Sequence, residues 1–170
     1  MVGKRHRNRH HRPRPVFQHI GEEEVFRKYA LDMRNHAVSW RGYHVGGSGI
    51  GVKADGTYVP LTGYNSKAAP GPRRKGDKCA EMRIIDDAEK QRCVAILEMW
   101  IAQPPQPDDF TGLDLGVAIS CGHCRLLYEK KLHNPKSALR RDTRLNFIDS
   151  NNSKRARPFT VEQLLRLCSK

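Results

Sequence analysis

Two short cysteine segments constrain this chain more than any other feature. The first is Cys-Ala-Glu at residues 79–81, and the second is Cys-Gly-His-Cys at residues 121–124. A C-x-x-C pair commonly supplies two thiolate ligands to zinc, and the earlier cysteine adds a third. Three protein ligands leave the fourth tetrahedral position open for water, as in catalytic zinc sites, and Glu81 is close enough in sequence to reach that water. The predicted ligands are Cys79, Cys121 and Cys124.

Other short segments precede and follow these two along the chain. Tyr-His-Val-Gly at residues 43–46 and Gly-Tyr-Asn at residues 63–65 come before them. Arg125 directly follows the second cysteine segment, and a helix-like stretch at residues 159–165 closes the chain. In this order the segments resemble the small cytidine deaminase family, which includes the blasticidin deaminases. The resemblance runs over residues 25–167, nearly the whole chain.

The resemblance implies a fold, a cofactor and a reaction. The fold is α/β, with three α/β/α layers around one central mixed sheet. The reaction is attack of a zinc-activated water on the amino-bearing carbon of a cytosine-type ring, with Glu81 as the proton shuttle. The main-chain amide of Ala80, next to Cys79, is implied to hold the substrate carbonyl. On the sugar side the resemblance assigns stacking to Tyr43 and a ribose hydroxyl to Asn65.

Three positions depart from the family pattern. The glutamate that binds ribose in the family is Lys67 here, a charged donor that fits a phosphate or an acidic substituent better than a bare ribose. The arginine that often follows Cys-Ala-Glu in members with three cysteine ligands is Met82, with Arg83 next and Arg125 near the second pair. The proline before C-x-x-C is Ser120. We therefore expect an intact reaction centre beside an altered substrate pocket.

Each candidate residue also has a simpler interpretation. The three thiols form a structural zinc site if His123 supplies the fourth ligand. In the simpler interpretation, Glu81 is an exposed residue in the first turn of a helix, a common place for glutamate. Asn65 is then a turn residue, Tyr43 a core side chain, and Lys67 part of a solvated loop. The sequence alone leaves these interpretations open.

The net charge of +13 is unevenly distributed along the chain. Residues 1–15 hold six Lys or Arg and no acid, and residues 129–157 hold nine against three acids. Because residues 1–15 contain few apolar groups, they are predicted to form a disordered basic tail before a zinc domain at residues 16–170. Both basic segments are candidates for contact with nucleic acid, where cations neutralise phosphates. A solubility tail and a solvated face are the alternatives.

The composition also bears on location. No apolar run approaches the ~20 residues of a membrane span, and no apolar stretch follows the basic N-terminus as in a secretory signal. Five cysteines are an odd set, which fits reduced thiols and metal better than disulfides. Cys93 and Cys168 are expected to be small buried hydrophobic residues. These features predict a cytoplasmic protein without a membrane partner.

Periodicity and turn residues predict alternating helices and strands. Helices are expected at residues 22–38, 80–92, 122–132 and 160–167, the last one capped by Thr160. Strands are expected at residues 43–52, 58–61, 93–102 and 145–148, with an Asp55-Gly56 turn between the first two. Loops are expected at residues 66–77 and 103–114. The alternation predicts a three-layer α/β domain.

Three functions are compatible with these observations. The first is zinc-dependent deamination of a small substrate, namely a cytosine nucleoside, a nucleotide or an analogue such as a nucleoside antibiotic. The resemblance then implies a homo-oligomer, a dimer or tetramer, whose neighbouring subunits close the site. The second is deamination of cytosine within single-stranded DNA or RNA, favoured by the charge distribution and by Lys67. The third is a non-catalytic nucleic-acid-binding module that holds zinc, which the presence of Glu81 disfavours.

Overall fold

The computed structural model describes residues 20–40, 42–72, 74, 76–104, 122–148 and 156–167. The predicted tail at residues 1–15, most of the predicted 103–114 loop, and Cys121 lie outside these ranges. Within the described ranges the chain forms four helices and seven strands. In the same ranges, no helix is both long enough and apolar enough to cross a membrane.

The elements alternate along the chain much as the sequence predicts. The helices are α1 (Ile20–His36), α2 (Ala80–Lys90), α3 (Gly122–Leu132) and α4 (Val161–Leu167). The strands are β1 (Val38–Ser39), β2 (Gly46–Lys53), β3 (Tyr58–Tyr64), β4 (Ser66–Lys67), β5 (Cys93–Ala102), β6 (Arg144–Ile148) and β7 (Ala156–Thr160). Five strands form the central sheet in the order β3-β2-β5-β6-β7, while β1 and β4 form a separate parallel pair. The central sheet is mixed, because β5 and β6 are parallel and the other neighbours are antiparallel.

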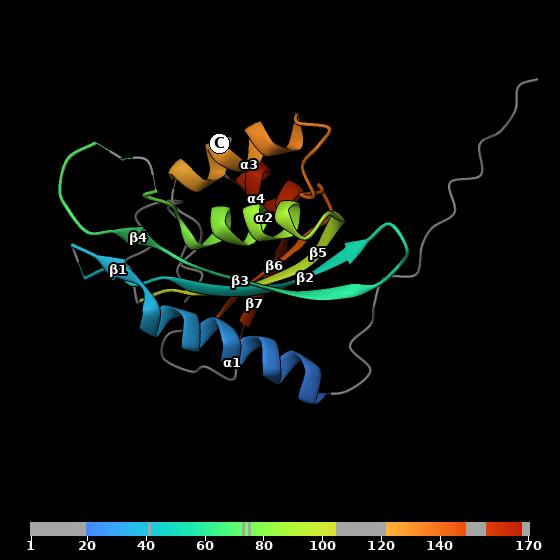
Figure 1. Ribbon diagram of the computed structural model, residues 1–170, viewed down its shortest axis with the longest axis horizontal. Helices are drawn as coiled ribbons and strands as arrows, with labels where there is room; N and C mark the ends of the chain where they lie inside the picture. The colour runs from blue at the N-terminus through green and yellow to red at the C-terminus, as the bar shows by residue number, and fades with distance from the viewer. Residues whose placement is uncertain are drawn as a thin grey trace, which may run out of the picture.

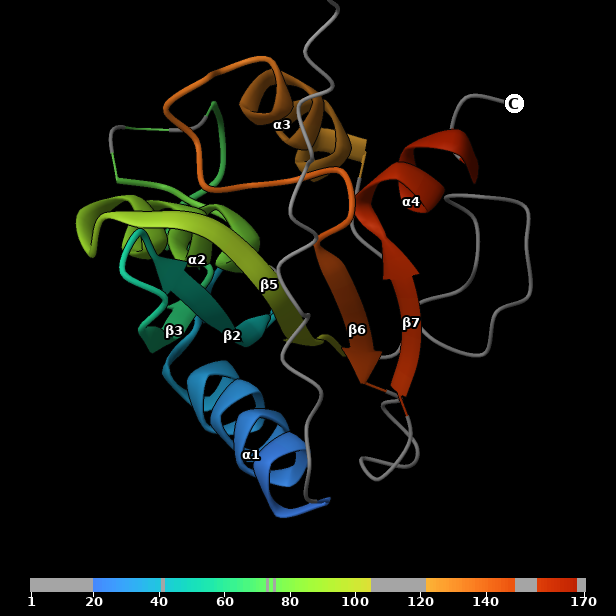
Figure 2. The same cartoon turned by 90° about the vertical axis from the view of Figure 1, so that its right-hand side faces the viewer.

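The sheet lies between two layers of helices. Figure 1 shows α1 on one face and α2, α3 and α4 on the other, and Figure 2 shows the same layers after a quarter turn. Side chains on a strand alternate between the two faces, so β5 contributes to two cores. Met99 and Ile101 belong to the cluster under α2, α3 and α4, while Trp100 and Ala102 belong to the cluster under α1. The predicted three-layer fold with a central mixed sheet is confirmed.

The core under α1 depends on a very close approach of helix to sheet. Phe26 stacks on Trp100 with ring centroids 5.2 Å apart. A Cβ atom at Gly46 would lie 1.9 Å from the main-chain nitrogen of Arg34, so α1 rests directly on the β2 backbone. This contact explains why a glycine follows Val45 in the 43–46 segment. Any larger residue would push α1 off the sheet.

Several expectations about the elements are confirmed, and some are wrong. The bounds of β5 and α3 agree with the predicted ones. Thr160 does cap α4: its Oγ1 accepts from the Gln163 N–H at 3.1 Å, and its own N–H donates to Gln163 Oε1 at 2.8 Å. Strand β7, an edge strand that contains Pro158, was not predicted. Helix α1 ends at His36 instead of Val38, because Val38 pairs with Ser66 in β1–β4.

Candidate active site

The predicted site residues gather at one end of the sheet. Gly46, the first residue of β2, pairs with Tyr64 at the end of β3 and with Ala102 at the end of β5. Ser66 of β4 forms a bridge with Lys78, the residue before Cys79. The same end therefore receives the start of α2 and the β1–β4 pair, at the left of Figure 1. The structure brings together the segments that carry Tyr43, Asn65, Lys67, Ala80 and Glu81.

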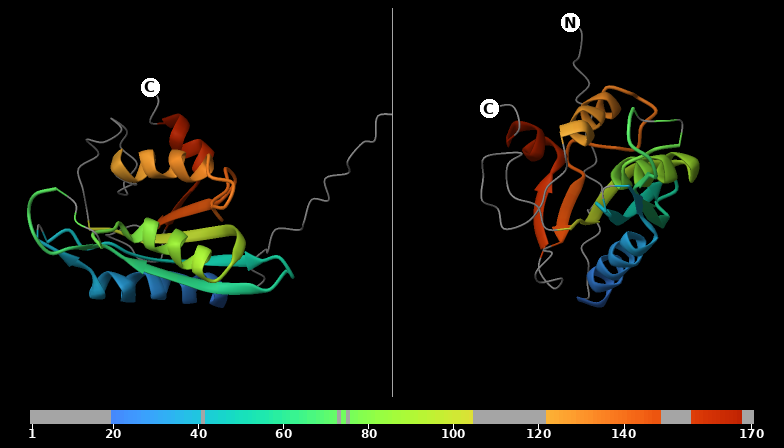
Figure 3. Two further views of the ribbon diagram at one scale, coloured as in Figure 1. Left: turned by 45° about the horizontal axis from the view of Figure 1, so that its top comes forward. Right: turned by 90° about the vertical axis from the view of Figure 1, so that its left-hand side faces the viewer.

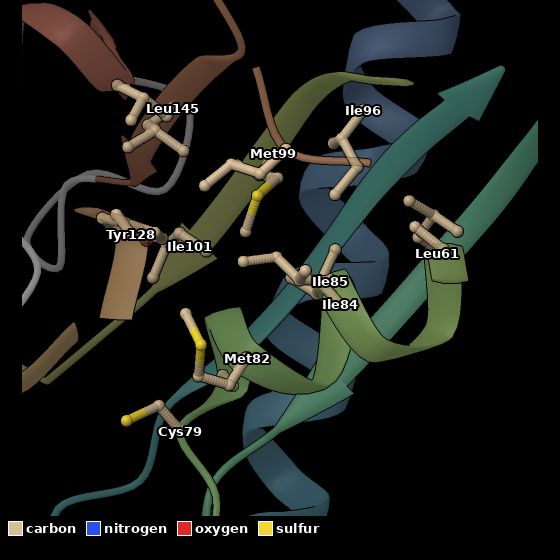
Figure 4. Packing of buried hydrophobic residues seen from close by; sticks show 14 of the residues in the cluster. Leu61, Cys79, Met82, Ile84, Ile85, Ile96, Met99, Ile101, Tyr128 and Leu145 are labelled. Carbon is tan, nitrogen blue, oxygen red and sulfur yellow. The ribbon is translucent and has the colours of Figure 1, made fainter. Parts of the chain in front are cut away.

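The Cys-Ala-Glu segment begins α2 and is buried. Cys79 is the N-cap residue of α2, with an extended backbone, and it is 6% exposed. Ala80 is fully buried, and Glu81 is only 2% exposed. Figure 4 shows the side chains of Cys79 and Met82 at one end of the core cluster. The interpretation of Glu81 as an exposed first-turn residue is therefore wrong.

Helix α3 lies beside α2 and runs in the same direction (Figures 1 and 3). Lys131, near the end of α3, joins them, because its Nζ lies 2.8 Å from Oε1 of Glu89 and 3.6 Å from Oδ1 of Asp86. Cys124 precedes Lys131 by seven residues, or roughly 10 Å of helix. In a parallel pair this offset places the backbone of Cys124 toward the N-terminal end of α2.

This arrangement fits the proposed zinc ligands in two respects. Cys79 is the N-cap residue of α2 and Cys124 lies in the first turn of α3, so both belong to helix N-termini, whose positive dipole ends favour thiolates. A set of three thiolates also suits the preference of zinc for sulfur. Among the described side chains, no three His, Cys, Asp or Glu gather around a common point. Cys121 and the side chain of Cys124 lie outside the described set, so the three-cysteine ligand set stays a prediction.

The substrate-side candidates are tied to one another through the main chain. Asn65 accepts from the Val45 N–H through Oδ1 at 2.9 Å and donates through Nδ2 to the Tyr43 carbonyl at 2.7 Å. The Tyr43 hydroxyl in turn donates to Oε1 of Gln103 at 3.0 Å. Asn65 thus holds the segment that presents Tyr43. Its contact with a ribose hydroxyl, and the stacking role of Tyr43, stay predictions.

Lys67 makes hydrogen bonds through both its side chain and its main chain. Its Nζ donates to the carbonyl of Gly71 at 2.5 Å, and its main-chain carbonyl accepts from the Trp40 N–H at 2.9 Å. Lys67 as a whole residue is half-buried. An anionic substrate group would have to share this ammonium with the Gly71 carbonyl. The predicted phosphate contact of Lys67 stays a prediction.

Cys93 is separate from the candidate site. It begins β5, where it is 8% exposed, and its Sγ lies 2.4 Å from where a Cβ of Gly51 would be. Burial raises the pKa of the Cys93 thiol above its usual value. A protonated, enclosed thiol is a poor metal ligand and a good packing group. Cys93 is the small buried residue that the sequence predicts.

A groove of about 410 Å³ lies on the outer side of α2, between that helix and the edge strand β3. Its walls include Tyr64, Lys78, Arg83 and Lys90. None of the predicted site residues lines this groove. The outer and inner sides of α2 are therefore chemically different, because Glu81 and Met82 face the core.

Sequence reasoning missed the roles of four residues that shape this end of the sheet. It named Gly63 and Arg83 without these roles, and it did not single out Ser66 or Gln103. Gly63 carried a usable signal, because a lone glycine inside a strand often marks a close backbone approach. Gln103 carried a weaker signal, because it directly follows the buried strand β5. Ser66 and Arg83 gave none, since their importance comes from hydrogen bonds between distant segments.

Comparison with known proteins supports the fold. No protein-family model matches the sequence, and no curated protein sequence matches it. The solved structure of cytidine deaminase from Burkholderia pseudomallei matches with a TM-score of 0.56 at 15% identity, over 83% of this chain and 94% of that one. A point mutant of cytidine deaminase from Mycobacterium tuberculosis matches with a TM-score of 0.50 at 17% identity, over 84% of this chain and 93% of that one. The chain has the cytidine deaminase fold that its motifs predict.

We expect Gly63→Ala to destabilise the protein, because α2 begins directly on the Gly63 backbone. A Cβ there would lie 2.5 Å from the Ala80 carbonyl oxygen and 3.0 Å from the Ile84 nitrogen. Overpacking of this kind costs about 1–3 kcal/mol of unfolding free energy, which urea titration would measure. The exposed neighbour Thr62→Ala is the control and should stay within about 0.5 kcal/mol of wild type. Equal stability of the two variants would show that α2 does not depend on this contact.

Proposed function

We propose that this protein is a zinc-dependent hydrolytic deaminase of a cytosine-type nucleoside, nucleotide or nucleoside analogue. The observation that carries the proposal is Glu81, a carboxylate 2% exposed in the first turn of α2, two residues after the buried Cys79. Burying a carboxylate is costly, and such groups concentrate at functional sites. The cytidine deaminase fold supports the same reaction class. Incubating the purified protein with cytidine, cytidine monophosphate and a single-stranded oligonucleotide, and measuring ammonia, tests the proposal.

In the proposed mechanism Glu81 moves protons while the start of α2 orients the ring. Zinc held by Cys79, Cys121 and Cys124 would supply a Lewis acid that lowers the pKa of water toward ~7. Glu81 takes a proton from the attacking water and gives it to the ring nitrogen. It then transfers the second proton of that water to the departing amino group. The reaction consumes one water and releases one ammonia, and the water oxygen becomes the new ring carbonyl.

The first-turn amide of α2 is suited to the substrate carbonyl. Ala80 is the first residue of α2, and the first N–H groups of a helix have no partner within it. In the proposal, the Ala80 N–H donates to the ring carbonyl. Tyr43, fixed by Asn65 and Gln103, lies along the sugar. Lys67 offers its ammonium to an anionic substituent. The homo-oligomer, a dimer or tetramer, and the cytoplasmic location also stay predictions.

A polynucleotide substrate is the second candidate, and the basic segment at residues 129–157 favours it. Within its described part, Lys130, Lys136, Arg141 and Arg144 are all exposed. Exposed cations of this kind can neutralise phosphates along a strand. The predicted basic tail at residues 1–15 would add to them. A single-stranded substrate also requires an open groove at the site, lined by basic and aromatic side chains.

The zinc prediction is one ion per chain. Elemental analysis of freshly purified, unchelated protein should find it. We expect Cys→Ser changes at positions 79, 121 and 124 to lose the metal, because each would remove a thiolate. Cys93→Ser should keep it, because Cys93 is enclosed in the core. Metal-free wild-type protein, or full zinc in the Cys79→Ser variant, would refute this ligand set.

The Glu81 prediction separates proton transfer from metal binding. Glu81→Ala should keep zinc and the fold, while turnover falls by at least the ~100-fold typical of losing a general acid–base group. Glu129→Ala, which changes an exposed glutamate of α3, is the control and should keep wild-type turnover. Turnover of Glu81→Ala within a few-fold of wild type would remove this residue from the mechanism.

Deletion of residues 1–15 and the change Lys67→Glu distinguish the two substrate classes. With a small substrate, we expect the deletion to leave turnover unchanged at all salt concentrations. With a polynucleotide, the deletion should weaken binding and flatten its salt dependence, since fewer counterions are released. Lys67→Glu should raise activity on cytidine and lower it on a phosphorylated substrate. Salt-sensitive oligonucleotide binding that disappears with the tail, together with cytosine conversion in the strand, would favour the second candidate.

A further inference from the structure

Arg83 connects α2, the helix that carries Glu81, to the segment between β4 and α2. It is the fourth residue of α2 and lies on the outer side, whereas Glu81, Met82 and Ile84 are buried. One guanidinium nitrogen donates to Oγ of Ser66 at 2.6 Å and to the carbonyl of Gly76 at 3.2 Å. The guanidinium carbon also lies 5.2 Å from the centre of the Tyr64 ring. A single side chain thus reaches the end of β3, β4 and the far side of the loop.

Ser66 is where these contacts meet. Its hydroxyl donates to the Gly76 carbonyl at 2.9 Å while it accepts from Arg83. Its N–H donates to the Lys78 carbonyl at 3.0 Å. Ser66 lies between Asn65 and Lys67, and Lys78 precedes Cys79. The Arg83–Ser66 hydrogen bond therefore links the helix that carries Glu81 to both the substrate-side strand and the approach to Cys79.

The chemistry of this link favours arginine. A planar guanidinium donates from several nitrogens in a fixed fork and stacks on an aromatic ring, whereas an ammonium is a compact, strongly hydrated point charge. The arrangement has a cost, since Nε of Arg83 is buried and has no hydrogen-bond partner among the described residues. A buried N–H without a partner lowers stability. An apolar side chain would avoid that cost but would lose the hydrogen bonds to Ser66 and Gly76.

We propose that Arg83 is a positioning residue: it fixes β4, and with it Asn65, relative to α2 and Glu81. The inference rests on the proposed deaminase function and adds a determinant of substrate binding to it. Glu81 lies on the buried side of α2 with Ile84 and Ile85, which belong to the core, so we expect this side of the helix to stay in place without Arg83. Loss of Arg83 should therefore loosen the substrate side and leave the proton shuttle in place.

Kinetics of the full-length, zinc-loaded protein test this division. We expect Arg83→Met to raise KM for the substrate about tenfold, while kcat stays within about threefold, because a misplaced positioning group weakens binding. Simple destabilisation would instead reduce the active fraction, which lowers kcat and leaves KM unchanged. Arg83→Lys, which keeps a donor but loses the planar fork, should fall between wild type and Arg83→Met. The control is Lys90→Met, on the same side of α2 and exposed, with wild-type KM expected.

Hydrogen exchange tests the same inference without turnover. In Arg83→Met, amides of residues 66–72 and 76–78 should exchange at least about tenfold faster, while those in the core turns of α2 keep their protection. If Arg83→Met does not fold, Ser66→Ala removes the other partner and should give the same pattern. If the wild-type protein deaminates no substrate, the proposed function fails, and exchange still decides the role of Arg83. Wild-type exchange in these amides, or in an active protein an unchanged KM, would overturn the inference.

Discussion

The contact between the start of α2 and the Gly63 backbone is the constraint on which the candidate site depends. The Ala80 carbonyl lies where a side chain at Gly63 would begin, so helix and strand touch main chain to main chain. This closeness buries Cys79 and Glu81 at the end of the core rather than at the rim of a loop. A thiol and a carboxylate enclosed in this way sit in a low-dielectric setting, where their electrostatic interactions are stronger than in water.

The neighbouring elements are arranged around that contact. Lys131 pairs with Asp86 and Glu89 and so links α3 to α2, whose N-terminal ends lie on the same side of the sheet. On the opposite side, Asp87 and Gln91 satisfy the outer edge of β3, accepting from the Thr62 N–H and donating to the Pro60 carbonyl. Helix α2 therefore carries Cys79 and Glu81 on its inner side, while two of its outer side chains satisfy main-chain groups at the edge of the sheet.

Sequence patterns predicted the parts of the fold that local chemistry determines. Neighbouring residues suffice to predict three of these elements. They are the apolar run of β5, the helix formers of α2 and the Thr160 cap of α4. Strand β7 was missed because Pro158 and exposed positions hide a pairing that only β6 defines. The reaction-centre motif could be recognised because each of its two segments, at residues 79–81 and 121–124, is short and continuous. The hydrogen bonds from Asn65 to residues 43–45 could not be predicted, because its partners are main-chain groups of a distant segment.

X-ray absorption at the zinc edge tests the central claim most directly, namely that two helix starts create an open three-thiolate site beside Glu81. An open site predicts three sulfur neighbours at about 2.3 Å and one lighter oxygen neighbour at about 2.0 Å. Replacement of that oxygen by an added substrate analogue should change only the lighter shell. Four sulfur neighbours, or three with the outer-shell pattern of a histidine such as His123, would mean a closed structural site and contradict the account.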